Sequence, residues 1–578
     1  MAKNSFIPIL DWLPNYQKTW LSGDLSAGLT VGVMLIPQGM AYSMLAGLPP
    51  IHGLYAVTIP LILYAIFGTS RQLAVGPVAM VSLLTAAGIG ALHPDSPEMW
   101  LLLAITLAFL VGTIQFLMGL FRLGFLVNFL SHPVISGFTS AAAIIIGLSQ
   151  LKHLLGIKIP NSEYVHEIIL ATAEHIGEVN LLTLGIGLVA IVVIKGMRKI
   201  HKAIPGALVA VILGILAVWG LHLTDQGVKI VGEVPSGLPG FSLPSFDLAS
   251  WQILLPTALT ISLVGFMESF AVAKAIQSKH KDYQVDANQE LMALGLANFG
   301  AAFFQGYAVT GGFSRTAVND QAGAKTGLAS IISASLIVLT LLFLTPLFYY
   351  LPNAVLAAVI LVAVSSLIDY KEARHLWEND RSDFWMLLAT FIVTLTLGIE
   401  KGILAGVVLS LGIVIYRATR PHVAVLGRVP DSMFFRNIKR FDNLEQRPDI
   451  LVVRFDGPLF FSNINYFKDK MAELAAEKGK ALRLIVLNAD SMSHLDSSAI
   501  HALEEWVSDN RQNGIEVHFT SVIGPVRDTL NRWGLTHTIG EHCFFMSNYQ
   551  AIQAFDHRNG AVPEKRDYEE YILQANED

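Results

Sequence analysis

The sequence predicts an α-helical protein that crosses a membrane many times and ends in a soluble α/β domain. Of its 578 residues, 53% are hydrophobic and only 15% are charged, against about 25% charged in soluble proteins. The mean hydropathy is +0.53. Charge is also uneven, because the last 158 residues hold 17 of the 39 Lys and Arg and 23 of the 45 Asp and Glu. We therefore expect a membrane domain over residues 1–420, a soluble domain over 421–560 and a C-terminal tail over 561–578.

Thirteen apolar runs are long enough to cross the roughly 30 Å of hydrocarbon in a bilayer. They lie near residues 25–45, 51–69, 73–92, 100–121, 125–150, 180–196, 204–222, 252–276, 286–305, 328–349, 351–368, 383–399 and 402–418. A shorter segment after Arg315 brings the expected number of spans to fourteen. The first 21 residues lack the apolar core and cleavage site of a signal peptide, so we expect the spans themselves to direct insertion.

The positive charges predict the orientation of these spans. With the N-terminus inside, the loops expected on the cytoplasmic side hold 17 Lys and Arg residues. The opposite loops hold four, namely Lys152, Lys158, Lys229 and Lys401. Membrane proteins concentrate Lys and Arg in their cytoplasmic loops. We therefore expect both termini in the cytoplasm. The expected location is the inner, cytoplasmic membrane of a bacterial cell.

Two glycine-containing breaks occupy comparable positions in the two halves of the membrane domain. One, residues 72–79, opens the third span, and the other, 311–318, opens the tenth. Such paired breaks indicate an inverted repeat, here over about 20–222 and 250–420, with the N-termini of two half-helices directed at an anionic substrate. The free N–H groups of these termini supply directed donors and partial positive charge.

The second break places Ser314 and Arg315 between two strongly apolar runs. Irregular backbone at membrane depth is tolerated only where it is buried in protein or lines a cavity, and charged residues there usually mark a pathway. Arg315 offers planar donors to an oxyanion, and Ser314 adds a hydroxyl. Alternatively, Arg315 extends to the membrane interface or forms a structural pair with Glu268. We favour a substrate-binding site.

Three residues of the first and third spans complete the predicted substrate site. Gln38 stands between Pro37 and Gly39, which we expect to open the helix so that the amide can donate to an oxyanion. The alternative for Gln38 is a hydrogen bond between helices. Tyr42 lies one turn further on, and packing is the alternative there. Ala79 contributes through its backbone N–H group.

Glu268 lies in the middle of the eighth span, where loss of hydration disfavours a carboxylate. A neutral acid can share a pocket with an anion. After the substrate and the proton leave, the carboxylate can pair with Arg315 and hold the empty carrier, which gives a cycle for proton symport. A structural ion pair is the alternative. Sodium can also replace the proton, because carboxylate, carbonyl and hydroxyl oxygens suit a hard cation.

Other classes of function find little support in the sequence. Cys543 is the single cysteine, which excludes an intrachain disulfide, and a net charge of -6 gives no basic surface for nucleic acid. No nucleophile and base, metal cluster or phosphate loop has usable spacing. We therefore predict neither an enzyme nor a bound cofactor, and the expected partners are a small inorganic anion and membrane lipid.

Short motifs follow one another along the membrane domain in a recognisable order. They are Pro37-Gln38-Gly39-Met40-Ala41-Tyr42, Pro50-Ile51-His52-Gly53-Leu54-Tyr55-Ala56, Tyr64, Gly68-Thr69-Ser70-Arg71, Gly76-Pro77, Met267-Glu268-Ser269 and Ser314-Arg315. Together they resemble the sulfate permease (SulP, or solute carrier 26) family of anion transporters. His52 departs from the family pattern, which usually has an aromatic residue there. The resemblance implies a seven-plus-seven inverted repeat with core and gate domains as in nucleobase transporters, an elevator-type movement and a homodimer.

The C-terminal domain alternates strands and helices. Strand-like runs at 450–455, 484–487 and 515–519 separate helical patterns at 464–478, 497–511 and 524–533. The domain resembles the STAS domain that sulfate transporters share with anti-sigma factor antagonists. In those antagonists the serine at the position of Ser498 is phosphorylated, which implies a regulatory site and a cytosolic regulatory partner. The alternative is that Asp496 and Ser497 only cap a helix.

The expected function is secondary active uptake of an inorganic oxyanion, with sulfate as the substrate and the proton as the coupling ion. Bicarbonate with sodium, and C4-dicarboxylates with protons, are alternatives within the same class. A passive anion channel or exchanger is a different mechanism, against which Glu268 argues. A third alternative is a sensor that binds an anion without transporting it.

Overall fold

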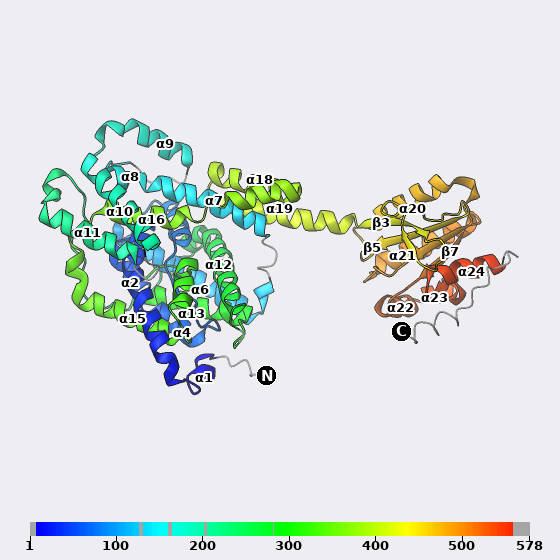
Figure 1. The fold of residues 1–578 in the computed structure, drawn as a ribbon, viewed down its shortest axis with the longest axis horizontal. Coiled ribbons are helices and arrows are strands. Elements are labelled where there is room, and N and C mark those ends of the chain that lie inside the picture. Colours follow the sequence, from blue (N-terminus) through cyan, green and yellow to red (C-terminus); the bar gives the residue numbers. More distant parts are fainter. Residues whose placement is uncertain (1–6, 126–130, 160–163, 201–204, 281, 559–578) are drawn as a thin grey trace. The chain divides into compact units, whose positions relative to one another are not determined.

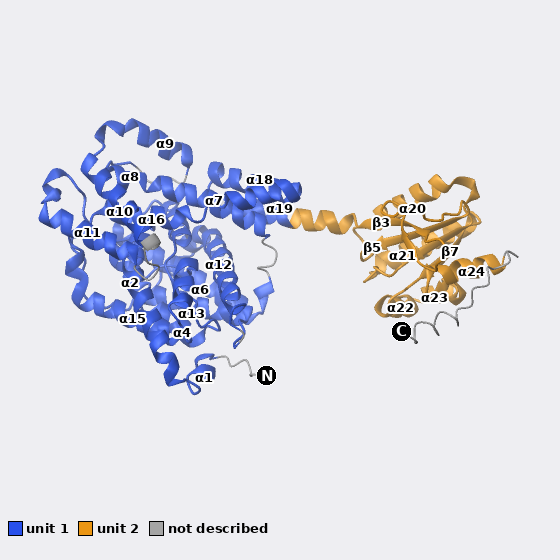
Figure 2. Cartoon of the chain, viewed as in Figure 1, with its two compact units in different colours: residues 1–410 blue, residues 411–578 orange. Residues whose placement is uncertain are grey.

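The computed structural model describes residues 7–125, 131–159, 164–200, 205–280 and 282–558. It divides into two compact units, residues 1–410 and 411–578 (Figure 2). Each unit has its own hydrophobic core. The tail expected over 561–578 lies outside the described residues.

Helices make up almost all of the first unit (Figure 1). Its first half contains α1 (Ile9–Trp12), α2 (Leu21–Leu45), α3 (Pro50–Tyr55), α4 (Ile59–Phe67), β1 (Val75–Gly76), α5 (Ala79–Gly90), α6 (Pro97–Leu120), α7 (His132–Ser149), α8 (Leu151–Leu155), α9 (Val165–Glu174), α10 (Leu181–Ile200) and α11 (Gly206–Gly220). Its second half contains α12 (Leu248–Gln277), α13 (Ala287–Phe303), β2 (Thr310–Gly311), α14 (Phe313–Gln321), α15 (Leu328–Leu339), α16 (Asn353–Ser365), α17 (Tyr370–Asn379), α18 (Arg381–Leu397) and α19 (Ile399–Thr419), which continues into the second unit.

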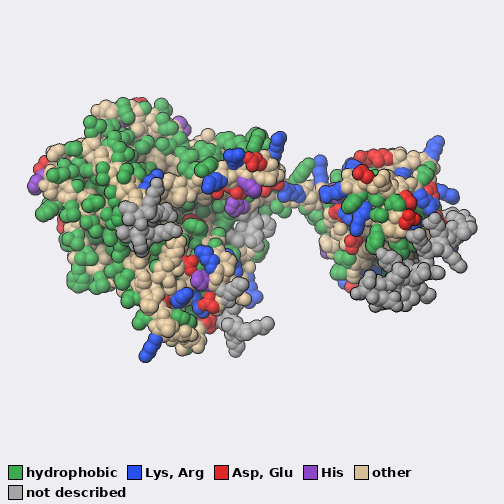
Figure 3. Space-filling view, viewed as in Figure 1, with side chains coloured by type: hydrophobic (Ala, Val, Ile, Leu, Met, Phe, Trp, Pro, Cys, Tyr) green, Lys and Arg blue, Asp and Glu red, His purple; other side chains and the backbone are tan. Residues whose placement is uncertain are grey.

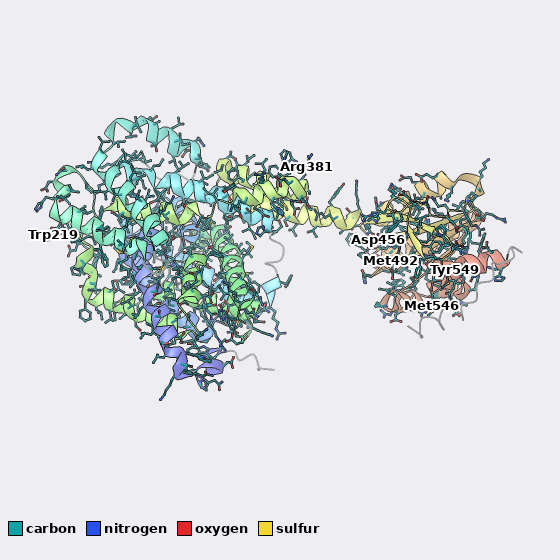
Figure 4. All side chains as sticks on the ribbon, in the orientation of Figure 1. Trp219, Arg381, Asp456, Met492, Met546 and Tyr549 are labelled. Atoms are coloured by element: carbon teal, nitrogen blue, oxygen red, sulfur yellow. The ribbon has the colours of Figure 1, made fainter. Side chains whose placement is uncertain are left out.

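Eight helical segments of the described residues are long and apolar enough to cross a membrane. They are Lys18–Leu45, Pro50–Phe67, Pro97–Leu120, His132–Leu155, Leu248–Gln277, Leu328–Phe348, Asn353–Asn379 and Lys401–Thr419, and Ala79–Gly90, Leu181–Met197 and Gly206–Gly220 are shorter apolar helices. Hydrophobic side chains cover most of the visible surface of this unit (Figure 3). Trp219, on α11, is 58% exposed and lies at the outer edge of the unit (Figure 4). The unit is therefore a multi-pass membrane domain, while the number fourteen stays a prediction.

The membrane helices pack in two groups, which are the core and gate of the fold. In the core, α13 packs against α4 and α6, α2 packs against α15, and α12 packs against α5 and α6. In the gate, α7 packs against α18, and α10 packs against α11 and α16. One predicted span differs, because residues 51–69 form two helices, α3 and α4, instead of one. Pro60, at the start of α4, has no N–H group for a continuous helix, which explains the break.

The second unit is a six-stranded sheet in the order β4-β3-β5-β6-β7-β8. Its elements are β3 (His422–Arg428), β4 (Phe435–Asn437), β5 (Ile450–Asp456), α20 (Ile464–Lys478), β6 (Leu484–Asn488), α21 (Ser497–Gln512), β7 (Glu516–Thr520), α22 (Gly524–Arg532), α23 (Leu535–Ile539), β8 (Phe544–Phe545) and α24 (Asn548–Arg558). Strands β5 to β8 are parallel, and β3 and β4 are antiparallel additions at one edge. The three strands and three helices predicted here are present, whereas β3, β4, β8, α23 and α24 were not predicted.

Candidate anion-binding site

The two chain breaks predicted from the sequence lie side by side in the core. Strands β1 and β2 pair antiparallel, with Val75 opposite Gly311 and Gly76 opposite Thr310. The N–H group of Gly312 also donates to Ala74 O at 3.1 Å. Helices α5 and α14 begin directly after these strands, so the pairing brings together the starts of the third and tenth spans.

Neither of these helices is capped by a side chain at its start. The first intrahelical bonds run from Ser82 N to Val78 O and from Thr316 N to Gly312 O, both at 3.0 Å. The N–H groups before them have no partner within an α-helix. In α5 they belong to residues 79–81, which include Ala79, and in α14 to residues 313–315. Two sets of donors therefore converge near the strand pair, with the positive ends of two helix dipoles behind them.

Arg315 supplies the full positive charge of this site. Only 2% of the residue is exposed, and its Nη1 donates to Pro77 O at 2.7 Å. Its Nε and Nη2 have no hydrogen-bond partner. The guanidinium fits because Gly312 has no side chain, since a Cβ at that position would lie 2.7 Å from Nη2 and 2.8 Å from Cζ of Arg315. Two buried N–H-bearing atoms are thus left for a ligand.

Helix α12 is fastened to β2 beside Glu268. The next residue, Ser269, accepts a hydrogen bond from Gly311 N at 2.7 Å. Its hydroxyl lies 2.7 Å from that of Thr310, which donates to Gly265 O at 2.6 Å. These two hydroxyl groups are fully used within the protein. They hold the half-buried Glu268 at the edge of the helix starts.

Glu268 and Arg315 lie close enough for their charges to attract each other, and Tyr42 lies near both. The two charged side chains nevertheless form no ion pair, because Arg315 bonds Pro77 through Nη1 and its other two nitrogens are unpartnered. The structural ion pair considered as an alternative is therefore absent from this conformation.

Helix α2 brings Gln38 and Tyr42 to the same region. Both are buried, at 8% and 6% exposure, and Oε1 of Gln38 has no partner. The expectation that Pro37 and Gly39 open this helix is wrong, because α2 continues through both residues. Gly39 serves packing instead, since a Cβ there would lie 2.9 Å from Gly53 O of α3. Close contact between α2 and α3 therefore explains the glycines of two motifs.

Ser314 differs from its prediction, and the structure adds Tyr307, for which no role was predicted. Ser314 is exposed at the second position of α14, so its hydroxyl does not line an enclosed pocket here, and its N–H group belongs to the first turn. Tyr307 is fully buried, and its hydroxyl lies 3.0 Å from that of Ser82 on α5. It also lies near Tyr42 and Arg315. Sequence reasoning missed Tyr307 and Ser82, although Tyr307 is a polar residue directly beside the glycine-rich break.

Glu290, on α13, explains several motif residues that had no assigned role. Its carboxylate is fully buried and accepts hydrogen bonds from Tyr64 Oη at 2.6 Å, Thr69 N at 2.7 Å, Thr69 Oγ1 at 2.6 Å and Ser70 N at 3.1 Å. These bonds fasten the loop before the first break to the second half of the chain. His52, the departure from the family pattern, is likewise buried and lies with Nδ1 2.8 Å from Gln305 O.

Asp24, on α2, makes the reciprocal connection. It is fully buried and accepts from Lys325 N at 2.6 Å, Thr326 N at 3.0 Å, Thr326 Oγ1 at 2.7 Å and Tyr16 Oη at 3.1 Å. A carboxylate of the first half thus holds the loop that follows the second break. Sequence reasoning missed both carboxylates. An acidic residue near the start of a span was the available signal.

In the second unit, Ser498 lies in the first turn of α21 and is exposed. Asp496 caps this helix by accepting from Ala499 N at 2.8 Å, and it also accepts from Phe461 N at 2.8 Å. The capping role that the sequence allowed is therefore present for Asp496. Modification of Ser498 stays a prediction.

Comparison with known proteins places this architecture in a family. The model of the sulfate permease family matches residues 21–390, and the model of the STAS domain matches residues 443–551. The chain belongs to the sulfate permease family. It is therefore a membrane protein of a family of sulfate-type anion transporters, and it carries a STAS domain.

Similar sequences from other organisms align with nearly the whole chain. Sulfate transporter 4.1, chloroplastic, of Arabidopsis thaliana is 40% identical over 95% of this chain and 82% of its own length. A probable sulfate transporter of Mycobacterium tuberculosis is 34% identical over 96% of this chain and 99% of its own length.

Solved structures show the same fold. Murine Slc26a9, an anion transporter in the inward-facing state, is 26% identical and covers 96% of this chain and 95% of its own, with a TM-score of 0.87. The transmembrane domain of the cyanobacterial bicarbonate transporter BicA is 26% identical and covers 69% of this chain and 99% of its own, with a TM-score of 0.60.

Proposed function

We propose that this protein takes up sulfate and related inorganic oxyanions by proton-coupled secondary transport. The observation that carries the proposal is Arg315, which is almost fully buried between two uncapped helix starts and has two nitrogens without a partner. Buried polar groups are normally paired. An oxyanion between α5 and α14 would satisfy Arg315 and the free N–H groups together. The sulfate transporters among the relatives support sulfate as the anion.

The chemistry of the site fits an anion that carries no proton. Helix N–H groups, the Arg315 guanidinium and the Tyr42 hydroxyl can all donate, and sulfate only accepts at neutral pH. Glu268 is the exception, because an ionised carboxylate accepts and repels an anion. We propose that Glu268 is protonated while sulfate is bound and loses its proton when sulfate leaves. The proton then travels with the substrate.

We further propose that the core moves against the gate as a rigid body, in an elevator-type movement. The bonds of Asp24 and Glu290 support this proposal, because they fasten each half of the core to a loop of the other half. A homodimer in an inner membrane, with both termini in the cytoplasm, completes the proposal. Single cysteines in the loops around Arg71 and Lys229 test the orientation by labelling from one side, since the native Cys543 is buried.

The test is uptake of labelled sulfate into proteoliposomes with and without an inward proton gradient. Wild-type protein should concentrate sulfate only with the gradient. Glu268→Gln keeps a neutral, donating side chain, so we expect sulfate binding to remain and gradient-driven uptake to be lost. Uptake by Glu268→Gln that still follows the imposed gradient would remove Glu268 from the coupling mechanism.

Sodium-coupled bicarbonate uptake is the second candidate, and the similarity of the membrane unit to the transmembrane domain of BicA favours it. An ionised Glu268 can accept the proton of bicarbonate, which sulfate does not offer. Competition of labelled sulfate uptake by bicarbonate, with and without sodium at two pH values, separates the two candidates. Succinate in the same assay tests the C4-dicarboxylate alternative.

A further inference from the structure

The STAS domain has a cavity that its own helices leave open. Helices α20 and α21 cover one face of the sheet, where Phe467 and Trp506 are buried. On the opposite face α24 packs against β6, β7 and β8. Beside α24, above β3, β4 and β5, lies a cavity of about 330 Å³ with an apolar floor that includes Leu426, Ile450 and Val452. Cavities of this size and lining hold small molecules in other proteins.

One end of the cavity is closed by an ion-pair network. Arg447 donates to both carboxylate oxygens of Asp556 on α24, each at 2.8 Å. It also bonds both oxygens of Asp449, at 3.1 and 2.7 Å. Nζ of Lys478, at the end of α20, donates to Arg447 O at 2.7 Å. Arg447 therefore commits four of its five N–H groups to these two carboxylates, and Lys478 commits one of its three.

Arg428 and Tyr549 form the other end of the cavity. Tyr549 belongs to α24 (Figure 4). The guanidinium carbon of Arg428 lies 5.2 Å from the centre of the Tyr549 ring, and Nε donates to Ser432 O at 2.8 Å. The terminal nitrogens of Arg428 have no partner among the described residues. The backbone of Arg428 pairs with that of Glu445 at 2.9 and 2.8 Å, which keeps this wall in place.

The charges around the cavity balance in number, but one cation has no carboxylate partner. Arg447 is shared between Asp449 and Asp556, and these two carboxylates with Glu445 match the three basic side chains. Arg428 forms no ion pair among the described residues, although it lines the cavity. Burial lowers the pKa of Lys478, and the nearby carboxylate of Asp449 opposes this shift. Lys478 therefore already has an anionic neighbour, which Arg428 lacks. An apolar floor beside one guanidinium that lacks a carboxylate partner complements a ligand with an apolar body and a single negative charge.

We propose that this cavity binds a small organic monoanion, with an aromatic or branched apolar body on the floor and a carboxylate or similar group at Arg428. The site is separate from the membrane substrate site, and inorganic anions lack the apolar body to fill it. Occupation would hold α24 against β3 and β5 through Tyr549, so the ligand is suited to regulating the STAS domain.

Labelling of introduced cysteines tests this proposal directly, because the one native cysteine is buried. Gln553→Cys on α24 and Gln446→Cys in the loop before β5 each place a thiol at the cavity, while Cys543 is only 5% exposed. The full chain in nanodiscs is treated with a maleimide in the presence of 1-naphthoate. We expect saturable protection, slowing both labelling rates by at least about tenfold, whereas Asp509→Cys, on α21, is labelled at an unchanged rate.

Matched probes and a second substitution separate the proposal from its alternatives. 1-Naphthalenemethanol has the same rings without the charge, and acetate has the charge without the rings, so we expect neither to protect. Adding Arg428→Gln should remove the protection by 1-naphthoate, measured as the ratio of the labelling rates of that variant without and with the ligand. The proposal would be overturned if 1-naphthalenemethanol protected as well as 1-naphthoate, or if 1-naphthoate slowed the labelling of Asp509→Cys as much as that of the cavity cysteines. It would also be overturned if 1-naphthoate protected neither Gln553→Cys nor Gln446→Cys.

Discussion

The membrane unit holds buried charged groups in two contrasting environments. Asp24 and Glu290 each accept four hydrogen bonds from backbone and hydroxyl groups. Arg315, by contrast, makes one hydrogen bond and has two nitrogens without a partner, and Glu268 forms no ion pair with it. The first environment is complete within the chain, whereas the second leaves two nitrogens of Arg315 unpartnered, and our proposal assigns them to the transported anion.

This difference distinguishes a structural charge from a binding charge. A buried donor without a partner costs about 1–3 kcal/mol, so a fold retains one where a ligand supplies the missing partner during function. The four bonds to Glu290 leave no room for a ligand. By the same reasoning, removing Glu290 should damage the fold, and removing Arg315 should damage transport.

Glu290→Ala should have the largest effect. It leaves the donors of Tyr64, Thr69 and Ser70 buried without an acceptor, for which we expect a loss of about 3 kcal/mol or more of stability. Thermal unfolding in detergent should show a clearly lower midpoint. Glu378→Ala, which breaks an exposed pair with Arg374 on α17, is the matched control and should unfold like wild type. Wild-type stability of Glu290→Ala would contradict the structural role.

Arg315→Gln should lower sulfate uptake about 100-fold, equivalent to about 2.7 kcal/mol, without lowering the unfolding midpoint. The reason is that the guanidinium loses only one hydrogen bond inside the protein, while the anion loses its charged partner. Arg381→Gln, on α18 (Figure 4), is the control and should transport normally. If the unfolding midpoint of Arg315→Gln is as low as that of Glu290→Ala, the distinction between a structural charge and a binding charge is wrong.

Gly312→Ala tests whether the position of the guanidinium matters as well as its presence. The new Cβ would lie 2.7 Å from Nη2 of Arg315, so the side chain must shift. We expect a loss of about tenfold in sulfate uptake, since small displacements of a binding group weaken ligand contacts strongly. Gly185→Ala, on α10, meets open space and should retain full uptake. Equal uptake by the two variants would show that Arg315 has room to move.

The smallest effect is expected in the STAS domain, where charges are paired at the surface. Hydrogen bonds from Arg447 lower the pKa of Asp449. A lowered pKa in the folded state means that this contact stabilises the domain at neutral pH and is lost as the pH falls below the ordinary value near 3.8. Asp449→Asn should therefore cost less than about 1 kcal/mol at pH 7 and nothing in acid. Hydrogen exchange of β5 at the two pH values measures this, and an equal effect at both would contradict it.

Much of this architecture was predictable because it depends on local pattern. Composition located the membrane domain, and the glycine-rich breaks marked the segments in which the structure has β1 and β2, although strands were not predicted there. Alternation of strands and helices gave β5, β6, β7, α20, α21 and α22. Short edge strands such as β4, and the break between α3 and α4, were missed because their signals extend over only a few residues.

The sequence by itself determined which chemical groups are available in the membrane, because a guanidinium, a carboxylate and two interrupted helices among apolar runs can be read along the chain. Tertiary structure alone decided which of the buried charges are satisfied. Glu290 and Glu268 are both acidic residues in apolar helices, and only the fold brings Tyr64, Thr69 and Ser70 to the first. The physical reason is that hydrogen bonds depend on distances between residues more than 200 positions apart, which no local pattern contains.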